Sequence, residues 1–500
     1  MRSRDPLRTS LLRALASFFV FRAGASSARA QVQDWNNHGG NGRANGLVGV
    51  NGPDSPNDLL WQGGPFSWFG WNPVVEGRRV FVVRQAGFPS EPVAGDATIY
   101  ALSLDTGAVL WSADLPFEPS EWSTWIAGVR DGRVYASRSG NGGSVSAPLY
   151  CLSAATGATL WHTAGDGDRP RHEIRAGPYG GAVFASDGDI IIPSLYALER
   201  FDAVTGELLW STPRFEQVGN TAGCLIVGDA IYTADAFSGM RVAIRKYDAQ
   251  TGAIGYRGPL LSGGLLHNAP FVGVDGRIYL PFSQNNSDQV DFLYSFTDTG
   301  SAIEQNWRVV SGGGGEFARW GVGPDGAVYS MSFTGTPDHS AEGCLQLLDP
   351  ATGAVVAQSQ TIQGDYMKIQ MAIDARGVLY VSNGTSGGAG RGRLFSFNPD
   401  LTERWSIPIP GNVNQGGPVL ATDGTLVVAS TDNFIAAWRT GKPPCAADMD
   451  GSGTVDSGDV AFALLDYGPC RGCAADLDGT GYVDFGDIAI MLLETGPCGI

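Results

Sequence analysis

The sequence predicts an all-β protein: a β-propeller of eight four-stranded blades, followed by a small α-helical module at the C-terminus. Two observations predict this architecture. A Thr-Gly turn followed shortly by tryptophan recurs at intervals of about fifty residues along most of the chain. Near the C-terminus, residues 445–470 and 473–498 repeat one another along their full length. A seven-bladed ring is the alternative, because the copies around 298–307 and 349–357 are degenerate.

The copy that ends at Trp111 reads LDTGAVLW and shows what one blade contains. Residues 98–104 alternate apolar and polar side chains, as a half-buried strand does. Asp105 and Gly107 form a tight turn, since aspartate can bond the nearby backbone and glycine accepts positive φ. Residues 108–115 return as the partner strand, and NPVVEG and RRVFVVRQ supply two strands upstream. Because a four-stranded unit cannot bury its own faces, we expect such units to stack around an axis.

The two ends of the propeller are expected to share one blade. Residues 58–62 read DLLWQ and resemble an outer strand that lacks its other three, whereas residues 418–439 read as three strands that lack a fourth. Joining the two segments closes the ring and covers both open sheet edges.

The first thirty residues have the pattern of a secretory leader. Arginines precede or flank the apolar run Leu11–Phe21, which is too short for a membrane span, and Ala28-Arg29-Ala30 offers a small-residue cleavage site. We therefore expect a signal peptide over 1–30 and a secreted protein, extracellular or periplasmic; a disordered tail is the alternative. The formal charge of −17 argues against nucleic acids and anionic membranes as partners. No other apolar run is long enough to span a membrane.

The rest of the chain divides at one proline-rich linker. The propeller is expected over 31–439, the linker over 440–444 and the C-terminal module over 445–500.

Within the C-terminal module, residues 448–459 and 476–487 space their oxygen-bearing side chains as calcium-binding loops do, at positions one, three, five, seven, nine and twelve. A glycine, Gly453 or Gly481, stands at position six for the sharp turn. Each loop runs into one helix, predicted over 459–467 or 487–494. We expect two bound calcium ions, held by Asp448, Asp450, Ser452, the Thr454 carbonyl, Asp456 and Asp459 in the first loop and by Asp476, Asp478, Thr480, the Tyr482 carbonyl, Asp484 and Asp487 in the second.

Four cysteines bracket the two copies, and four cysteines allow three pairings. Symmetry favours pairing Cys445 with Cys470 and Cys473 with Cys498, so that each copy is closed on itself. Such bonds would stabilise the module by roughly 3–4 kcal/mol. The remaining cysteines are isolated and are expected to be buried thiols: Cys151, Cys224 and Cys344.

The pattern A-x-D-x-x-T-G-x-x-x-W, clearest in YALSLDTGAVLW, YCLSAATGATLW and RFDAVTGELLW, resembles the repeat of the pyrroloquinoline-quinone-like (PQQ-like) propellers over residues 34–439. Quinone-dependent dehydrogenases of this fold carry two adjacent cysteines over the cofactor, and the propeller has no adjacent cysteines. The resemblance therefore predicts the blade but not a bound PQQ. It also implies that the repeated tryptophans pack between neighbouring blades: Trp111, Trp161, Trp210, Trp307 and Trp405.

A calcium loop with one exit helix, duplicated at the C-terminus with aspartate at position twelve, resembles a type I dockerin. The resemblance implies that the calcium ligands carry over and that the partner is a cohesin-like or cell-surface protein. Dockerins of cellulosomes often have Ser-Thr-like pairs at positions ten and eleven. Ser457-Gly458 and Phe485-Gly486 occupy these positions here, so the identity of the partner does not carry over.

Candidate ligand-binding residues of the propeller lie in the connections that enter the innermost strands, because these connections line the mouth of the central channel. They are polar, cationic and aromatic on an acidic background, which suits a sugar or an anionic glycan. Ordinary polar loops are the alternative. The candidates are Trp71, Trp125, His172, Arg175, Asn220, His267, Asn268, Arg319, Trp320, Lys368, Asn414 and Gln415.

Three functions are compatible with these patterns. The first is a non-catalytic binding or scaffolding protein, attached to a partner or surface through its tail. The second is an extracellular polysaccharide-degrading enzyme with its site at the channel mouth, and the third is a quinone-dependent dehydrogenase. The sequence has no H-E-x-x-H, G-x-S-x-G or Walker motif and predicts no catalytic residue. It therefore favours the first function.

Overall fold

The computed structural model describes residues 34–63, 73–85, 97–116, 121, 123–139, 145–167, 169–177, 181–214, 223–238, 241–262, 269–283, 291–310, 320–334, 342–363, 370–383, 392–410, 417–430, 434–440, 447–449, 454–470, 473, 475–478 and 480–497. The predicted signal peptide and most of the linker lie outside these residues.

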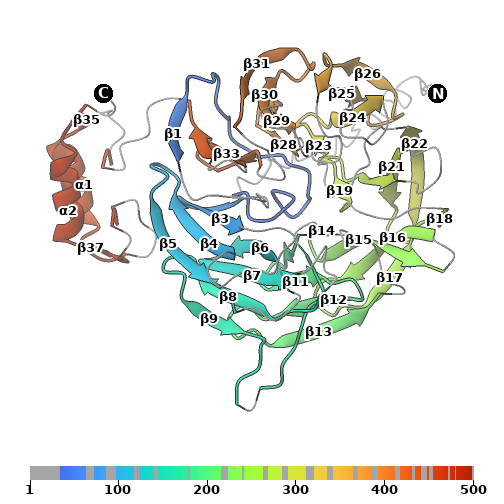
Figure 1. Ribbon diagram of the computed structural model, residues 1–500, viewed down its shortest axis with the longest axis horizontal. Coiled ribbons are helices and arrows are strands. Elements are labelled where there is room, and N and C mark those ends of the chain that lie inside the picture. The colour runs from blue at the N-terminus through green and yellow to red at the C-terminus, as the bar shows by residue number, and fades with distance from the viewer. Residues whose placement is uncertain are drawn as a thin grey trace, which may run out of the picture.

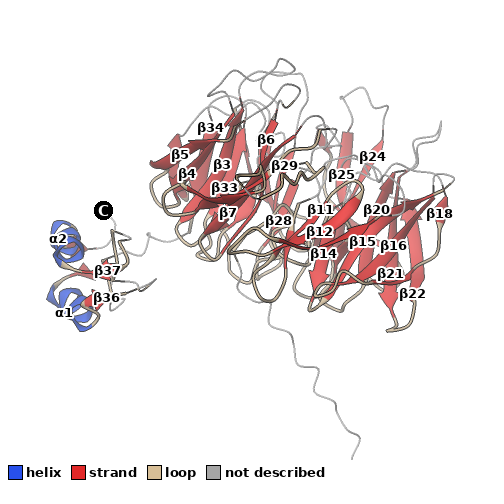
Figure 2. Cartoon of the chain, turned by 90° about the horizontal axis from the view of Figure 1, so that it is seen from below, coloured by secondary structure: helices blue, strands red, loops and turns tan. Residues whose placement is uncertain are grey.

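Eight antiparallel sheets, six with four strands and two with an additional short fifth strand, are arranged around one axis, which confirms the eight-bladed propeller and rules out seven blades (Figures 1 and 2). In blades 1 to 7 the strands follow one another from the innermost to the outermost in chain order. Blade 1 contains β2 (Val74–Glu76), β3 (Arg79–Gln85), β4 (Ala97–Ser103) and β5 (Val109–Asp114). Blade 2 contains β6 (Ser123–Arg130), β7 (Arg133–Ser139), β8 (Leu149–Ser153) and β9 (Thr159–His162). Blade 3 contains β10 (Val183–Phe184), β11 (Ile190–Pro193), β12 (Ala197–Phe201) and β13 (Leu208–Pro213).

The next four blades follow the same order. Blade 4 contains β14 (Cys224–Val227), β15 (Ala230–Phe237), β16 (Arg241–Asp248), β17 (Ile254–Arg257) and the short β18 (Leu261–Ser262). Blade 5 contains β19 (Phe271–Val272), β20 (Ile278–Ser283), β21 (Asp291–Asp298) and β22 (Ile303–Val310). Blade 6 contains β23 (Gly321–Val322), β24 (Val328–Thr334), β25 (Glu342–Leu348), β26 (Val355–Gln358) and the short β27 (Ile362–Gln363). Blade 7 contains β28 (Gln370–Ile373), β29 (Leu379–Asn383), β30 (Arg393–Phe397) and β31 (Glu403–Pro408).

Blade 8 is shared between the two ends of the propeller, as the sequence predicts. It contains β32 (Val419–Leu420), β33 (Leu426–Ser430) and β34 (Phe434–Trp438), completed by β1 (Leu59–Gly63) as the outermost strand. Strand β1 pairs antiparallel with β34, with Trp61 opposite Ala437. This pairing covers the two edges that would otherwise stay open.

A ring of tryptophans joins neighbouring blades. The indole Nε1 of Trp111 in blade 1 donates a hydrogen bond to the carbonyl oxygen of Ala154 in blade 2 at 2.9 Å, and its ring lies against Gly157 of the same turn. At Gly107, where φ is +69°, an added Cβ would lie 2.4 Å from the ring of Trp61, so only glycine fits. The same indole-to-carbonyl bond recurs for Trp61, Trp161, Trp210, Trp307 and Trp405, which confirms the predicted packing.

Two blades lack the tryptophan and show a different outer edge. Blade 4 has Tyr256 and blade 6 has Ala357 at the equivalent position. In both blades the outermost strand is split into two pieces, β17 with β18 and β26 with β27. Blades 4 and 6 therefore keep the blade structure but change the junction to the next blade.

At the junction of blades 4 and 5, a charged cluster replaces the indole contact. Tyr256 donates its hydroxyl to Asp298 of blade 5, and the Lys246 ammonium lies 2.8 Å from the same carboxylate. Tyr232 donates a further hydrogen bond to Asp298 at 2.6 Å. Burial alone would raise the pKa of Asp298, but the hydrogen bonds from Lys246, Tyr232 and Tyr256 outweigh it and lower that pKa to about 2.

We expect the Asp298→Asn variant to lose pH-dependent stability. The folded-state pKa of Asp298 lies below the ordinary value, so its contribution is present above the unfolded pKa and disappears as pH falls toward 2. The difference in free energy of unfolding between the wild type and the variant should be about 2 kcal/mol at pH 6 and should shrink between about pH 4 and pH 2. Denaturant unfolding at several pH values measures it. A difference that stays constant with pH would contradict a charge-based role.

Residues 34–50, here called the plug, fill the centre of the ring and hydrogen-bond to most of its blades (Figure 1). The plug offers carbonyl oxygens to backbone N–H groups at the ends of innermost strands. The bonds run from Val75 to Trp35, Val129 to Asn36, Ile226 to Gly42, Val272 to Arg43, Val322 to Asn45 and Ile373 to Gly46, at 2.7–3.2 Å. These bonds reach blades 1, 2, 4, 5, 6 and 7.

The remaining two blades contact the plug through side chains. Thr422 of blade 8 donates its hydroxyl to Asp34 at 2.6 Å, and His38 lies against Gly181 of the segment that leads into blade 3. The plug contacts the innermost strands toward their C-terminal ends. It therefore lies on the face of the propeller opposite the connections that lead into the N-terminal ends of these strands. The sequence predicts the propeller but not the plug.

The propeller core lies between adjacent blades, as expected for radially packed sheets. One continuous cluster of buried apolar side chains links blades 4 to 7, a second links blades 1 to 3, and a third joins blades 7, 8 and 1.

The C-terminal module pairs its two copies crosswise. Helices α1 (Ser457–Leu465) and α2 (Phe485–Leu493) contact each other, and the end of each copy pairs with the loop of the other. Strand β35 (Thr454–Val455) pairs with β38 (Gly496–Pro497), and β36 (Gly468–Pro469) pairs with β37 (Tyr482–Val483). The buried core is correspondingly symmetric: Ala447, Val455 and Ala463 from one copy, Ala475, Val483 and Met491 from the other. In the described part of the chain, neither helix has the length or apolar character that crossing a membrane requires.

Candidate functional site

Three carboxylates converge in the second loop of the C-terminal module. Asp476, Asp478 and Asp487 each present an oxygen, and these oxygens lie within 4.8 Å of one another. Oδ1 of Asp476 is buried and has no hydrogen-bond partner among the described residues. A buried carboxylate oxygen without a donor is costly, so this set of hard oxygen atoms could hold a divalent cation.

The start of helix α2 positions this cluster. The side chain of Asp484 caps the helix by accepting hydrogen bonds from Gly486 N–H at 2.7 Å and from Asp487 N–H. The Asp487 side chain accepts one in return from Asp484 N–H at 2.8 Å. This reciprocal arrangement is a capping box, and it fixes loop positions nine and twelve relative to each other. Burial alone would raise the pKa of Asp487, but the backbone N–H groups of Asp484, Asp478 and Leu477 outweigh it and lower that pKa.

The first loop repeats these features where it is described. Asp459 is buried and accepts hydrogen bonds from Met449 N–H at 2.6 Å and Asp456 N–H at 2.8 Å, as Asp487 does from Leu477 and Asp484. Asp456 caps helix α1. The predicted ligands Asp450 and Ser452 lie outside the described residues. Of the predicted ligands in the second loop, Thr480 is exposed, and the Tyr482 carbonyl accepts from the Thr480 hydroxyl at 3.3 Å.

The disulfide pairing favoured by symmetry is wrong for Cys470 and Cys473, which the structure bonds to each other with their Cα atoms 5.9 Å apart. The reason is the crosswise pairing of the copies. Cys470 follows β36, and its N–H bonds to the carbonyl of Gly481 in the other copy, so the end of the first copy lies beside the second copy. Cys445 and Cys498 lie outside the described residues. Cys151 and Cys224 are buried as expected, whereas Cys344 is only partly buried.

Helices α1 and α2 expose equivalent apolar side chains. Leu465 in α1 and its counterpart Leu493 in α2 are 82% and 87% exposed, and Leu464 and Leu492 are also exposed. Phe485, at the start of α2, is 78% exposed. So many exposed apolar side chains on one small module are typical of a protein-binding surface.

Four of the twelve predicted channel-mouth residues lie within the described part of the chain. Trp125 and Trp320 are 1% and 4% exposed and belong to the core. His172 is partly buried, with Nε2 2.9 Å from Oε1 of Glu199, and the Arg175 guanidinium lies 5.5 Å from the ring centre of Tyr196. The other candidates lie outside the described residues: Trp71, Asn220, His267, Asn268, Arg319, Lys368, Asn414 and Gln415.

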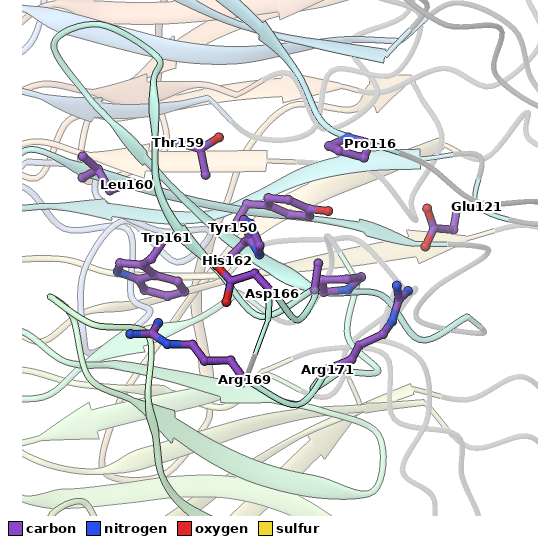
Figure 3. Close-up of a pocket in the computed structure, with 12 residues that line it drawn as sticks. Pro116, Glu121, Tyr150, Thr159, Leu160, Trp161, His162, Asp166, Arg169 and Arg171 are labelled. Carbon is purple, nitrogen blue, oxygen red and sulfur yellow. The ribbon is translucent and has the colours of Figure 1, made fainter.

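A pocket of about 740 Å³ lies on the predicted ligand-binding face of blade 2 (Figure 3). The connections around it lead from blade 1 to blade 2 and from blade 2 to blade 3. Tyr150 and His162 lie at its centre with ring centres 5.8 Å apart, and Nδ1 of His162 is buried without a hydrogen-bond partner. Its charged lining residues are Glu121, Asp166, Arg169 and Arg171. No sequence pattern marks these residues, because the pocket includes the outer strand β9 and not only the connections at the channel mouth.

Comparisons with known proteins agree with the fold. Residues 95–263 match the family model described as outer membrane protein assembly factor BamB. The solved quinohemoprotein alcohol dehydrogenase from Comamonas testosteroni superposes with a TM-score of 0.50 at 13% identity, covering 94% of this chain and 93% of that one. BamB from Moraxella catarrhalis gives a TM-score of 0.45 at 16% identity, covering 70% and 92%. No curated protein sequence matches the chain.

Proposed function

We propose that the chain is a secreted, non-catalytic binding or scaffolding propeller whose C-terminal module binds two calcium ions and docks, as dockerins do, onto a cohesin-like or cell-surface protein. The observation that carries this proposal is the group of three converging carboxylates in the second loop, with the unpartnered buried oxygen of Asp476. The matching arrangement around Asp459 supports a second ion in the first loop.

Calcium would act on the fold of the module. It would be held by the side chains of Asp476, Asp478 and Asp487 in the second loop and by their counterparts in the first, and it would supply the positive charge that close carboxylates lack. Asp487 would link the ion to the capping box of α2, and thereby tie the loop conformation to the helix direction.

The exposed face of the two helices is the proposed docking surface, and a cohesin-like domain is its occupant. Leu465 and Leu493 occupy equivalent positions in the two copies, so a calcium-ordered module presents them in a fixed relation. Phe485 adds an exposed aromatic side chain, with its ring centre 5.8 Å from that of Tyr467, and aromatic anchors commonly dominate binding energy.

Secretion is supported by the leader pattern of residues 1–30. The propeller would present a ligand on the face that holds the pocket around Tyr150 and His162, with a glycan as the proposed class. The polysaccharide-degrading enzyme and the quinone-dependent dehydrogenase stay alternative predictions.

Binding of the full chain to a panel of immobilised cohesin domains tests the docking proposal. We expect binding in calcium and none in a chelator, since docking needs ordered helices. The double variant Leu465→Asp and Leu493→Asp should weaken binding at least about tenfold, because buried charges oppose association. Leu209→Asp, an exposed leucine on blade 3, is the matched control and should bind normally. Binding that ignores the chelator, or no cohesin bound at all, would contradict the docking proposal.

A further inference from the structure

We propose that the Cys470–Cys473 disulfide is a redox switch for calcium binding at the second loop of the C-terminal module, where the disulfide form binds the ion tightly and the dithiol form binds it weakly. This inference rests on the proposed calcium site and adds regulation to it. The two cysteines join the end of the first copy to the start of the second, directly before the loop that carries the three converging carboxylates.

The disulfide and the second loop form one closed circuit of bonds. The N–H of Cys470 donates to the Gly481 carbonyl at 2.9 Å, and the N–H of Gly481 donates to Oδ2 of Asp476 at 2.9 Å. The N–H of Asp476 donates in turn to the Cys473 carbonyl at 3.3 Å. The S–S bond completes the circuit from Cys473 back to Cys470. Loop positions one and six, which are Asp476 and Gly481, are therefore held together through the disulfide.

This circuit orients the carboxylate of Asp476. Its Oδ2 is held by the N–H of Gly481, whereas its Oδ1 is buried without a hydrogen-bond partner among the described residues. When Gly481 moves, Asp476 loses the contact that fixes its direction. The apparent affinity for an ion falls with the fraction of molecules whose loop is already in the binding conformation. Opening the circuit should therefore weaken calcium binding without removing a ligand.

The strand pairing beside the disulfide is too short to hold the circuit by itself. Strands β36 and β37 contain two residues each, and such a short pairing is marginally stable in water. Pro469 lies opposite Tyr482 in this pairing and has no N–H to donate. The covalent bond at Cys470 therefore determines how firmly the end of the first copy stays against the second loop.

Both cysteines are only partly buried, at the margin of the module core, where a small dithiol can reach them. Reduction breaks the S–S bond and gives two cysteine thiols, with two electrons and two protons supplied by the dithiol, which itself becomes a disulfide. Disulfides persist in extracellular and periplasmic compartments and are rare in the cytosol. In a secreted protein, the second loop would therefore gain its full calcium affinity only after export.

Calorimetric titration of the full chain with calcium tests the switch one loop at a time. In Asp448→Asn, where the second loop is titrated, adding Cys470→Ser and Cys473→Ser should raise the Kd for calcium roughly tenfold. In Asp476→Asn, where the first loop is titrated, the same two serines should change the Kd by less than about twofold. These variants keep Cys445 and Cys498.

The reduction equilibrium of the wild-type chain gives a second readout, because coupling between two sites is reciprocal. Saturating calcium should shift the equilibrium with dithiothreitol toward the disulfide by the same factor of roughly ten, measured by alkylation and mass spectrometry of Cys470 and Cys473. Asp476→Asn should abolish this shift. Glu304→Gln, at an exposed glutamate on β22, removes the same charge elsewhere and should keep it.

The outcomes separate the switch from the calcium site itself. Two calcium ions bound with equal affinity with and without the disulfide would overturn the switch alone, as would equal weakening at both loops. A chain that takes up no calcium in either redox state would overturn the switch and the proposed function together. Circular dichroism shows whether the serine variant is folded. If it is not, the reduction equilibrium of the wild-type chain in calcium and in chelator still decides.

Discussion

Deletion of the plug, residues 34–50, is expected to lower the melting temperature of the propeller by about 10 °C or more. The deletion removes at least six backbone hydrogen bonds to innermost strands and leaves their buried N–H groups without partners. At about 1 kcal/mol for each bond, the loss is roughly 6 kcal/mol before any apolar burial is counted. Trp35, which is almost fully buried, adds to the loss.

Scanning calorimetry measures the plug effect, and two variants separate its causes. Trp35→Ala should cost about 3–5 kcal/mol through its cavity alone. Gln62→Ala, which truncates an exposed side chain on β1, tests whether any change near the N-terminal strand has the same effect. A deletion variant that melts within about 2 °C of the wild type would contradict the account.

The second large effect is expected for Asp235→Ala, at about 3–5 kcal/mol of unfolding free energy. Asp235 is fully buried in blade 4, with its Oδ1 3.0 Å from Nε of Arg214, which follows blade 3 and is itself fully buried. Tyr247 donates its hydroxyl to the same carboxylate. Removing the carboxylate leaves the Arg214 guanidinium buried beside blade 4 without its counter-charge.

Denaturant unfolding checks the Asp235 prediction against Asp229→Ala. Asp229 is an exposed aspartate on the same blade, and its loss should change stability by no more than about 0.5 kcal/mol. Equal effects from both variants would contradict a buried ion pair that joins blades 3 and 4.

Much of the fold could be predicted because local residues encode it. The Asp-Thr-Gly turn needs positive φ at Gly107, and the following tryptophan needs a neighbouring turn to pack on, so one motif specifies both the blade and its junction. The shared blade follows from two incomplete edges. The helices begin where Asp456 and Asp484 cap them, two residues before the predicted starts, because the capping box includes the last loop residues.

The rest depended on contacts that leave no side-chain pattern. The plug binds mainly through backbone carbonyls such as those of Asn36 and Gly42, which any residue could supply. The Cys470–Cys473 bond could not be predicted, because it depends on the end of the first copy pairing with the loop of the second copy. Chain position predicts Trp125 and Trp320 at the channel mouth, but both pack into the core between blades.

Calcium titration of the full chain by calorimetry tests the central claim most directly. The account predicts two calcium ions per chain, one of which is lost in Asp476→Asn and both of which are lost when Asp448→Asn is added, because each aspartate stands at position one of its loop. Glu304→Gln should bind both ions. A chain that takes up no calcium, or that binds two ions regardless of Asp476 and Asp448, would contradict the account.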